Sequence, residues 1–373
     1  LLVAYRKAKY DAYYERNHVS AAAFCSYEEN LIENLESILA LLTDPQSEWW
    51  ADPGIYGSYT YIPKRIDEPQ ANQRETPKDS PCFSVLLSDE DKRWIISCQS
   101  SANKKPKATF RLVGKHPVAF HVISALWILK VGHQYDAILS RSVRGSRLRR
   151  CKPENGKGIG TPNRIALGSF QPYAPNFRAW RAEGLQTIRS ELNHGREVVA
   201  VTTDVRSFYH CVCPTYLLEE RFLERAGINL SPEDKEFTDK YLRALLKWNR
   251  SSPSPDDTQP NREPLGVPVG LSAPRVIANA LLWGFDEFIE RDICPLYYGR
   301  YVDDIFLVLR NDQRIETAKD FWSFLQRRSD ATTTPAKLIW DGTSDDIRID
   351  LDYSPESEIF LAPKKSKVFV LDD

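Results

Sequence analysis

Aspartates at the ends of two predicted strands carry the clearest chemical signal in the chain. Asp204 directly follows the apolar, β-branched segment 198–203. The pair Asp303-Asp304 lies between the tyrosine-rich segment 297–301 and the apolar segment 305–309. Aspartate is rare in strands, and burying a carboxylate without a partner costs free energy, so a carboxylate pair at the tip of an apolar hairpin needs an explanation. A bound divalent cation supplies one.

Three carboxylates converge on one edge of a sheet if these two strands are neighbours. Their mutual repulsion would oppose ionisation unless cations neutralise it. Oxygen ligands of this kind favour Mg²⁺, with Mn²⁺ as the alternative. Two such ions about 3.5 to 4 Å apart activate an attacking oxygen and stabilise a leaving one, which is the chemistry of phosphoryl and nucleotidyl transfer. The alternative is a turn aspartate plus a solvated doublet, since three other Asp-Asp pairs occur elsewhere in the chain.

A basic segment precedes the aspartates. Residues 141–152 contain six basic and no acidic side chains, a local positive field that suits a triphosphate or a nucleic-acid backbone. A solvated charged face is the alternative. Further along, Gly266 and Gly270 would let the main chain approach a nucleotide closely. A purely structural Gly/Pro loop is the alternative there.

Hydrophobic periodicity predicts the elements that must position these residues, and their mixed order is typical of an α+β fold. The predicted helices cover 1–45, 117–130, 176–193, 215–249, 275–291 and 315–328. The predicted strands cover 82–87, 93–98, 109–113, 198–203 and a hairpin at 297–309. Segment 44–81 is rich in Pro, Asp, Gly and Ser, which predicts an irregular linker.

Composition excludes several classes of protein. The 373 residues include 50 basic and 51 acidic side chains, so the net charge of −1 gives no chain-wide attraction to nucleic acid or membrane. No apolar run is long enough to span a bilayer, and the N-terminus lacks the order of a signal peptide. Seven scattered cysteines without a CxxC pair predict neither a disulfide framework nor a zinc site, so we expect a reducing, cytoplasmic location without membrane association.

Five segments, in order along the chain, resemble motifs of the reverse transcriptase family. Tyr301-Val302-Asp303-Asp304 resembles the YxDD signature, and 204–209 (Asp-Val-Arg-Ser-Phe-Tyr) resembles the first catalytic motif. Segment 266–272 resembles the Pro-containing glycine loop under the nascent base pair. Segment 145–148 resembles the basic fingers segment, and Lys365-Ser366 resembles the later lysine motif.

Features around these motifs resemble one branch of that family. They are Trp180 ahead of a helix, the triplet Phe208-Tyr209-His210, and a helical N-terminus containing Tyr27-Glu28. All three are similar to bacterial abortive-infection (Abi) and defence-associated reverse transcriptases. Val269 stands where retroviral-type enzymes carry Gln, which favours a non-retroviral branch.

The resemblance implies a right-hand polymerase of α+β class, with an antiparallel palm sheet, helical and basic fingers, and a helical N-terminal extension. Residues 1–80 would form the extension and linker, 81–197 the fingers, and 198–373 the palm with an inserted helical segment at 214–249. We expect the thumb and a C-terminal region to be absent or unrecognisable.

The resemblance also implies roles for single residues. The implied metal ligands are Asp204, Val205, Asp303 and Asp304, of which the three aspartates are catalytic. The implied nucleotide-binding residues are Arg147, Tyr209, Gly270 and Lys365. Tyr209 would lie against the sugar 2′ position, with core packing as the alternative. Lys365 would give a proton to the leaving pyrophosphate.

The implied activity is Mg²⁺-dependent polymerisation of deoxynucleoside triphosphates into DNA, serving antiviral (phage) defence in a bacterial cytoplasm. Several Abi-type enzymes prime on protein or synthesise without a template, so protein-primed or untemplated synthesis is one expectation. An RNA template, a second copy of the chain and a defence protein are further candidate partners. The alternatives are a templated, intron-type RNA-directed DNA polymerase and a catalytically idle nucleic-acid-binding subunit. The intact carboxylates argue against the second.

Overall fold

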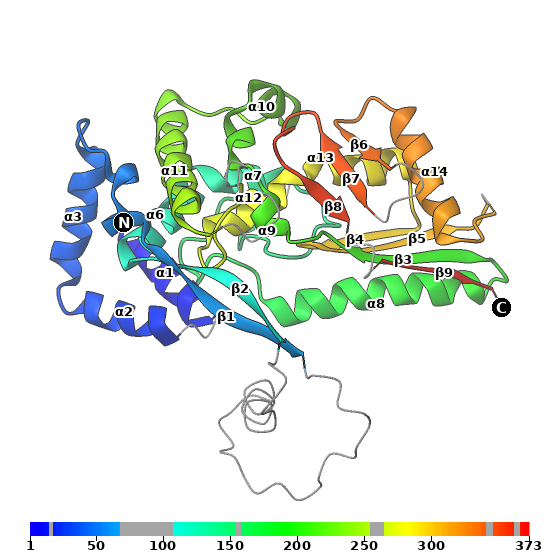
Figure 1. Ribbon diagram of the computed structural model, residues 1–373, viewed down its shortest axis with the longest axis horizontal. Coiled ribbons are helices and arrows are strands. Elements are labelled where there is room, and N and C mark those ends of the chain that lie inside the picture. The colour runs from blue at the N-terminus through cyan, green and yellow to red at the C-terminus, as the bar shows by residue number, and fades with distance from the viewer. Residues whose placement is uncertain are drawn as a thin grey trace, which may run out of the picture. The chain divides into compact units, whose positions relative to one another are not determined.

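The computed structural model describes residues 1–14, 18–67, 107–153, 158–253, 265–312, 314–340, 346–361 and 366–372. It is a mixture of helices and antiparallel sheets, so the α+β class is confirmed (Figure 1). Contacts divide the chain into a unit of 1–58 with 116–373 and a smaller unit of 59–115. The predicted domain boundary near residue 80 lies outside the described residues. Among the described helices, none combines the length and the apolar character that crossing a membrane requires.

The N-terminal region is helical, as the periodicity predicts. It consists of α1 (Leu2–Tyr14), α2 (His18–Glu28) and α3 (Leu31–Thr43), followed by the short helices η1 (Trp49–Ala51) and α4 (Pro53–Tyr56). The prediction of an irregular linker over 44–81 is wrong for its middle part, where β1 (Ser58–Asp67) pairs with β2 (Lys107–Lys115). The run Tyr-Thr-Tyr-Ile at 59–62 has high β propensity, although turn residues surround it. The predicted strands 82–87 and 93–98 lie outside the described residues.

Helices fill most of the remaining chain up to residue 330. Their bounds are α6 (Val118–Trp127), the π-helical turn η2 (Ile128–Gly132), α7 (His133–Ala137), α8 (Tyr173–Leu192), α9 (Phe208–Cys211), η3 (Pro214–Leu218), α10 (Glu220–Ala226), α11 (Pro232–Ser251), α12 (Ala273–Leu281), α13 (Trp283–Phe288), the π-helical turn η4 (Ile289–Ile293) and α14 (Ala318–Asp330). The single helix predicted over 275–291 is therefore interrupted at Leu282.

A four-stranded sheet carries the predicted catalytic segments. Its order is β4 (Tyr297–Tyr301), β5 (Asp304–Arg310), β3 (Val198–Asp204) and β9 (Lys367–Leu371), and each neighbouring pair is antiparallel. The predicted strand 198–203 and the hairpin at 297–309 are confirmed. A separate three-stranded sheet of β6 (Ala336–Ile339), β7 (Ile347–Leu351) and β8 (Ile359–Leu361) was not predicted.

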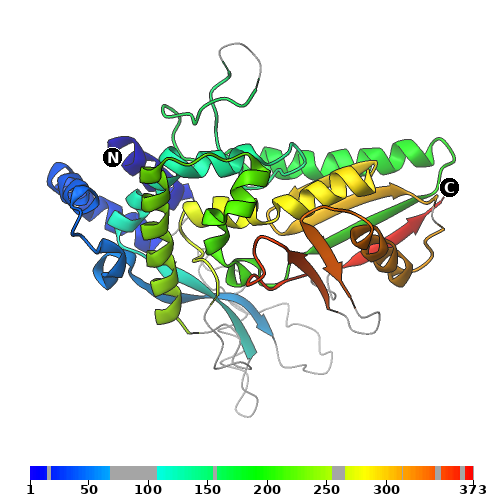
Figure 2. The ribbon, with the colours of Figure 1, turned by 90° about the horizontal axis from the view of Figure 1, so that it is seen from above.

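Helix α8 covers one face of the four-stranded sheet and runs along its strands (Figures 1 and 2). Trp180 and Ile188 of α8 pack into a cluster with Val198, Phe306 and other apolar side chains of the sheet. Gly184 permits this approach, because a Cβ at that position would lie 2.3 Å from a ring carbon of Phe306. The opposite face packs against α13, whose Asp286 accepts a hydrogen bond from Tyr298.

Two histidines are buried without charge in the helical core. His116 donates from Nδ1 to the Tyr56 carbonyl, 2.6 Å away. Within the part of the chain that the structure describes, neither the His116 nor the His121 Nε2 atom has a hydrogen-bond partner. Burial lowers the pKa of His116 to about 3 and that of His121 to about 4. Both imidazoles therefore stay neutral in the folded protein at pH values that protonate them in the unfolded chain.

We expect stability to fall as pH drops below about 6.5, the pKa of an unfolded-state histidine, and to go on falling towards pH 4. Above that pH both states are neutral, so these groups contribute no pH dependence. By pH 5 the loss is about 2 kcal/mol for each histidine. Urea unfolding between pH 5 and 7.5 measures it. His121→Gln should reduce the loss of unfolding free energy between pH 6.5 and pH 5. The exposed His194 is the control, and His194→Gln should leave that loss unchanged. A loss in His121→Gln equal to that of the wild type would contradict the explanation.

Candidate active site

The register of β3 against β5 brings the predicted metal ligands to one end of the sheet. Asp204 lies directly opposite Asp304 in the antiparallel pair. Side chains of directly opposed residues share a face of the sheet. The Val205 amide donates a 3.0 Å hydrogen bond to the Asp303 carbonyl, which fixes the hairpin tip against the end of β3. The two strands are therefore neighbours, as the convergence of three carboxylates requires.

The three carboxylates differ in exposure. Asp204 is buried at 6% exposure, Asp303 is half-buried and Asp304 is exposed. Across the described ranges, no three carboxylate, imidazole or thiolate side chains are arranged closely enough to hold a metal ion. The aspartates thus share one end of the sheet without forming a closed set of ligands.

The hairpin tip has an unfavourable backbone conformation. Val302, the first residue of the two-residue turn between β4 and β5, has φ of 62°. Tight hairpin turns commonly need positive φ, but a β-branched side chain is disfavoured there and usually gives way to Gly, Asn or Asp. Ser146 and Ser207, which belong to two other predicted motifs, also have positive φ, of 50° and 49°. Strained residues of this kind persist only where the surrounding structure holds them.

The segment after Asp204 is held by β8. Val205 forms an isolated antiparallel bridge with Leu361, and the Arg206 amide donates to the Phe360 carbonyl at 2.8 Å. The Arg206 guanidinium lies 5.0 Å from the Phe360 ring centroid. A strand that was absent from the sequence prediction therefore supports the first predicted motif.

Tyr209 and the glycine loop lie against each other. The Val267 amide donates to the Tyr209 carbonyl at 2.8 Å. Gly266 has φ of 126°, and a Cβ there would lie 2.9 Å from the His210 Cα atom. Phe208 is buried at 2% exposure, whereas Tyr209 is half-buried. The structure thus joins two segments to which the resemblance assigns nucleotide contacts.

The end of this loop is held by the N-terminal helix. Gly270 has φ of 112°, and two residues later the Ser272 hydroxyl donates to an Asp11 carboxylate oxygen at 2.8 Å. The other oxygen of Asp11 accepts from the Ser169 amide at 2.9 Å. Asp11 is buried at 8% exposure on α1. The N-terminal helix is therefore part of the structure around the candidate site.

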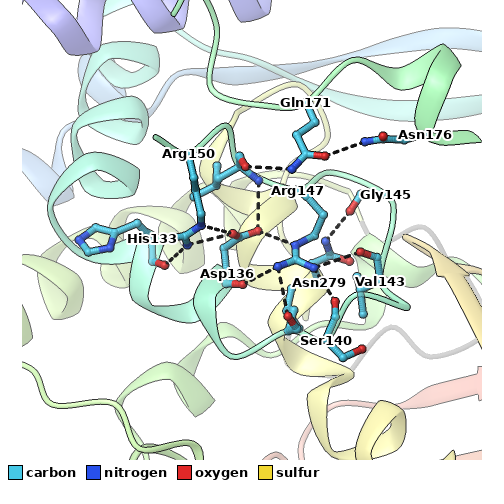
Figure 3. A network of polar contacts seen from close by, with 12 residues as sticks. His133, Asp136, Ser140, Val143, Gly145, Arg147, Arg150, Gln171, Asn176 and Asn279 are labelled. Atoms are coloured by element: carbon cyan, nitrogen blue, oxygen red, sulfur yellow. Dashed lines mark hydrogen bonds and ion pairs between the residues drawn. The ribbon is translucent and has the colours of Figure 1, made fainter. Parts of the chain in front are cut away.

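Arg147, which the resemblance assigns to nucleotide binding, lies in a network of internal hydrogen bonds. Its Nε donates to Asp136, and its remaining N–H groups donate to the carbonyls of Asp136, Leu139, Ser140 and Val143 (Figure 3). These five bonds use all five N–H donors of the guanidinium. In the described structure Arg147 therefore has no donor left for a phosphate, and it holds its own loop together.

Asp136 is the centre of that network. It is almost fully buried and forms ion pairs with Arg147 at 3.0 Å and with Arg150 at 2.9 Å. Arg150 also donates to the carbonyls of His133 and Gly160. The prediction treated segment 141–152 as a charge run available to a ligand, and the described contacts show that two of its arginines are instead internal.

Lys365 lies outside the described residues. Its neighbour Ser366 is described, and the Ser366 hydroxyl lies 2.6 Å from the Thr203 hydroxyl, next to Asp204. Ser366 therefore lies beside the end of β3.

Three buried charged residues around the site were not predicted from the sequence: Asp11, Asp136 and Arg300, which lies two residues before the hairpin turn. Only Arg300 carries a clear signal in the sequence, because a charged side chain among the aromatic residues of a strand needs a buried partner.

The chain has no match among protein-family models, and a search of curated proteins finds no relative.

The Asp136 network gives a stability prediction. Asp136→Asn should lower the free energy of unfolding by about 3 kcal/mol or more, because it removes the carboxylate between two largely buried guanidinium groups. Urea unfolding at neutral pH measures the effect. Asp239→Asn, which breaks the exposed pair of Asp239 with Arg243 on α11, is the matched control and should stay near wild-type stability. Equal stability of the two variants would contradict the central role of Asp136.

Proposed function

We propose that this protein is a divalent-metal-dependent nucleotidyltransferase that adds nucleotides at the end of the four-stranded sheet. The observation that carries the proposal is the β3–β5 register, which sets Asp204 opposite Asp304 with Asp303 bonded to Val205 through the main chain. A buried carboxylate beside a half-buried and an exposed one suits a site that opens to solvent on one side.

The donor chemistry fits Mg²⁺ or Mn²⁺. Asp204, Asp303 and Asp304 offer carboxylate oxygens and Val205 offers its carbonyl, and these hard oxygen ligands are the kind that both ions prefer. Bound metal would supply charge neutralisation and activation of the attacking oxygen. The protein's own contribution is to hold the carboxylates at one sheet end and to keep Asp204 away from bulk water.

Other residues would hold the nucleotide. The Tyr209 carbonyl accepts a hydrogen bond from the Val267 amide, so the main chain of this half-buried residue is fixed beside the glycine loop. Gly270 has φ of 112°, a backbone conformation that glycine adopts readily, shortly before α12 begins. We retain Tyr209, Gly270 and Lys365 in the proposed nucleotide site, and we leave Arg147 out because its donors are used internally.

The finer proposal is a DNA polymerase of reverse-transcriptase type, with the four-stranded sheet as its palm. It rests on the motif order given above, together with the placement of 145–148, 204–209, 266–272 and 301–304 around one sheet end. A role in phage defence and synthesis without a nucleic-acid primer belong to the same proposal. Offering each deoxynucleotide with and without primer and template, then sizing the product, separates this enzyme from a templated one.

Asp303→Asn should abolish nucleotide incorporation while leaving the fold intact, because carboxylates that share metal ions act as a unit. Incorporation of labelled deoxynucleotides with Mg²⁺ measures activity, and circular dichroism measures folding. Asp312→Asn removes an exposed carboxylate just beyond the far end of β5 and should keep wild-type activity. A folded Asp303→Asn protein with normal incorporation would remove the proposed function.

Tyr209→Ala should raise the use of ribonucleotides relative to deoxynucleotides, since it removes a ring that would exclude the 2′-hydroxyl. The change leaves the Tyr209 carbonyl, and so the anchor to Val267, in place. Competition between the two nucleotide types gives the ratio. Phe208→Leu, a change in the buried neighbour, is the control. An unchanged ratio in an active Tyr209→Ala protein would return this side chain to a packing role.

A further inference from the structure

A fully buried arginine lies directly beneath the strained hairpin tip. Arg300 on β4 has 0% exposure, and all five of its N–H donors are used. Two of them form a bidentate ion pair with Asp286 of α13, at 2.7 and 2.6 Å. Two donate to the Asn279 side chain and carbonyl on α12, at 2.9 and 3.0 Å. The fifth donates to the Val302 carbonyl at 2.8 Å.

The ion pair keeps this guanidinium charged. Burial by itself lowers the pKa of Arg300, but the Asp286 carboxylate and the Tyr298 hydroxyl raise it by more, so the net pKa lies above its ordinary value. Asp286 also accepts from the Tyr298 hydroxyl at 2.5 Å. The carboxylate is therefore held in place by three donors from β4.

A second support reaches the same turn from the side. Gly145 lies so close that a Cβ there would be 2.6 Å from the Val302 nitrogen. Its carbonyl accepts from the Asn279 side-chain amide at 2.7 Å (Figure 3). The Arg144 amide donates to the Arg300 carbonyl, and the Arg300 amide donates to the Ser142 carbonyl. Segment 142–145 therefore runs beside β4 and presses against the turn.

These contacts form a closed ring of interactions that begins and ends at Val302. Val302 is bonded to Arg300, Arg300 to Asn279, Asn279 to Gly145, and Gly145 packs on Val302. Val302 is the residue that the turn forces to φ of 62°, a conformation that valine disfavours. The position of Asp303, the next residue, depends on that conformation.

A buried ion pair is weak evidence for stability, because desolvating both charges offsets much of their attraction. What the pair does supply is a defined geometry, because all five donors of the Arg300 guanidinium have fixed partners. The geometry that this pair defines is that of the turn, since the guanidinium contacts the Val302 carbonyl directly.

We propose that Arg300, Asp286 and Asn279 form a positioning network that holds Val302 in its strained conformation and so sets the Asp303 carboxylate beside Asp204. The three are positioning residues, since they act through the turn. Their effect on metal binding and on catalysis rests on the proposed function, whereas their effect on the turn does not.

The first arm of the test is amide hydrogen exchange. Arg300→Lys keeps the positive charge facing Asp286 but cannot reproduce the planar fork of five donors. Exchange at residues 302–305 and at Val205 should quicken about ten-fold or more, with exchange of the β3–β9 pairing unchanged. Arg310→Lys, at the exposed far end of the same hairpin, is the matched control and should leave all of these rates unchanged.

Relief of the strain supplies a rescue. Glycine adopts positive φ without cost, so Val302→Gly removes the need to hold this residue. The double variant Arg300→Lys/Val302→Gly should recover most of the lost protection at the turn. If Arg300 only stabilised the fold in general, without acting on the conformation of Val302, the double variant would show no such recovery.

The second arm measures Mn²⁺ binding by electron paramagnetic resonance, and the third measures incorporation kinetics. Arg300→Lys should weaken Mn²⁺ binding about ten-fold and lower kcat by a similar factor, with KM for the nucleotide little changed. High Mn²⁺ should recover part of kcat. If Arg300→Lys does not fold, Asn279→Ser, which leaves the ion pair with Asp286 in place, must show the same pattern.

The outcomes separate this inference from the proposed function. Unchanged exchange at the turn, exchange raised across the whole sheet, or failure of Val302→Gly to restore protection each overturns the positioning role. Altered exchange with unaltered Mn²⁺ binding overturns the link to the metal. A wild-type protein that binds Mn²⁺ but incorporates no nucleotide rejects the proposed function, and the exchange and Mn²⁺ arms still decide the positioning role.

Discussion

The antiparallel register of β3 against β5 is the constraint on which the rest of the structure depends. Asp204 meets Asp304 only in this register, and a slip by one residue would move the side chains of a strand to the opposite face. The register is strongly specified because Val198, Val199 and Val201 are each at most 1% exposed. Both faces of β3 are therefore packed, and neither tolerates a slip. The order of the apolar residues along β3 thus determines where its final carboxylate lies.

Buried charges then hold the segments that surround this sheet end. Asp136 secures the loop that contains Gly145, and the Arg300–Asp286 pair secures the hairpin tip. On α1, Asp11 reaches Ser272, and Lys7 donates to the Ala166 and Gly168 carbonyls. Asp136, Asp11 and Lys7 lie on helices, and their partners lie largely on irregular segments. Arg300 instead joins β4 to α12, to α13 and to the turn. The packed elements therefore fix the loops, which is the arrangement that a reactive site with defined geometry needs.

Local sequence patterns were sufficient to predict those helices and strands that have regular apolar periodicity and recognisable terminal residues. Helix α8, strand β3 and the β4–β5 hairpin lie close to their predicted bounds, because apolar periodicity and terminal residues determine them locally. The strands β6, β7 and β8 have only three to five residues each and were missed. Strands this short show little periodicity of their own, and each of them forms by pairing with the next strand along the chain.

The same division applies to the candidate site. Proximity of Asp204 to Asp303-Asp304 was predictable, because each stands at a strand end and only one arrangement of two neighbouring antiparallel strands joins those ends. The engagement of Arg147 was not, because four of its five acceptors are main-chain carbonyls that carry no signal in the sequence. Arg300 could have been found, since an arginine in an otherwise buried strand implies a buried carboxylate partner.

Anomalous diffraction from crystals of the protein grown with Mn²⁺ tests the central claim most directly, because it locates the metal without reference to activity. The account predicts a strong anomalous peak at the sheet end, with carboxylate oxygens of Asp204 and of the Asp303-Asp304 pair within coordination distance. Ordered density for these three side chains with no anomalous peak between them, or with Mn²⁺ bound only elsewhere on the chain, would contradict it.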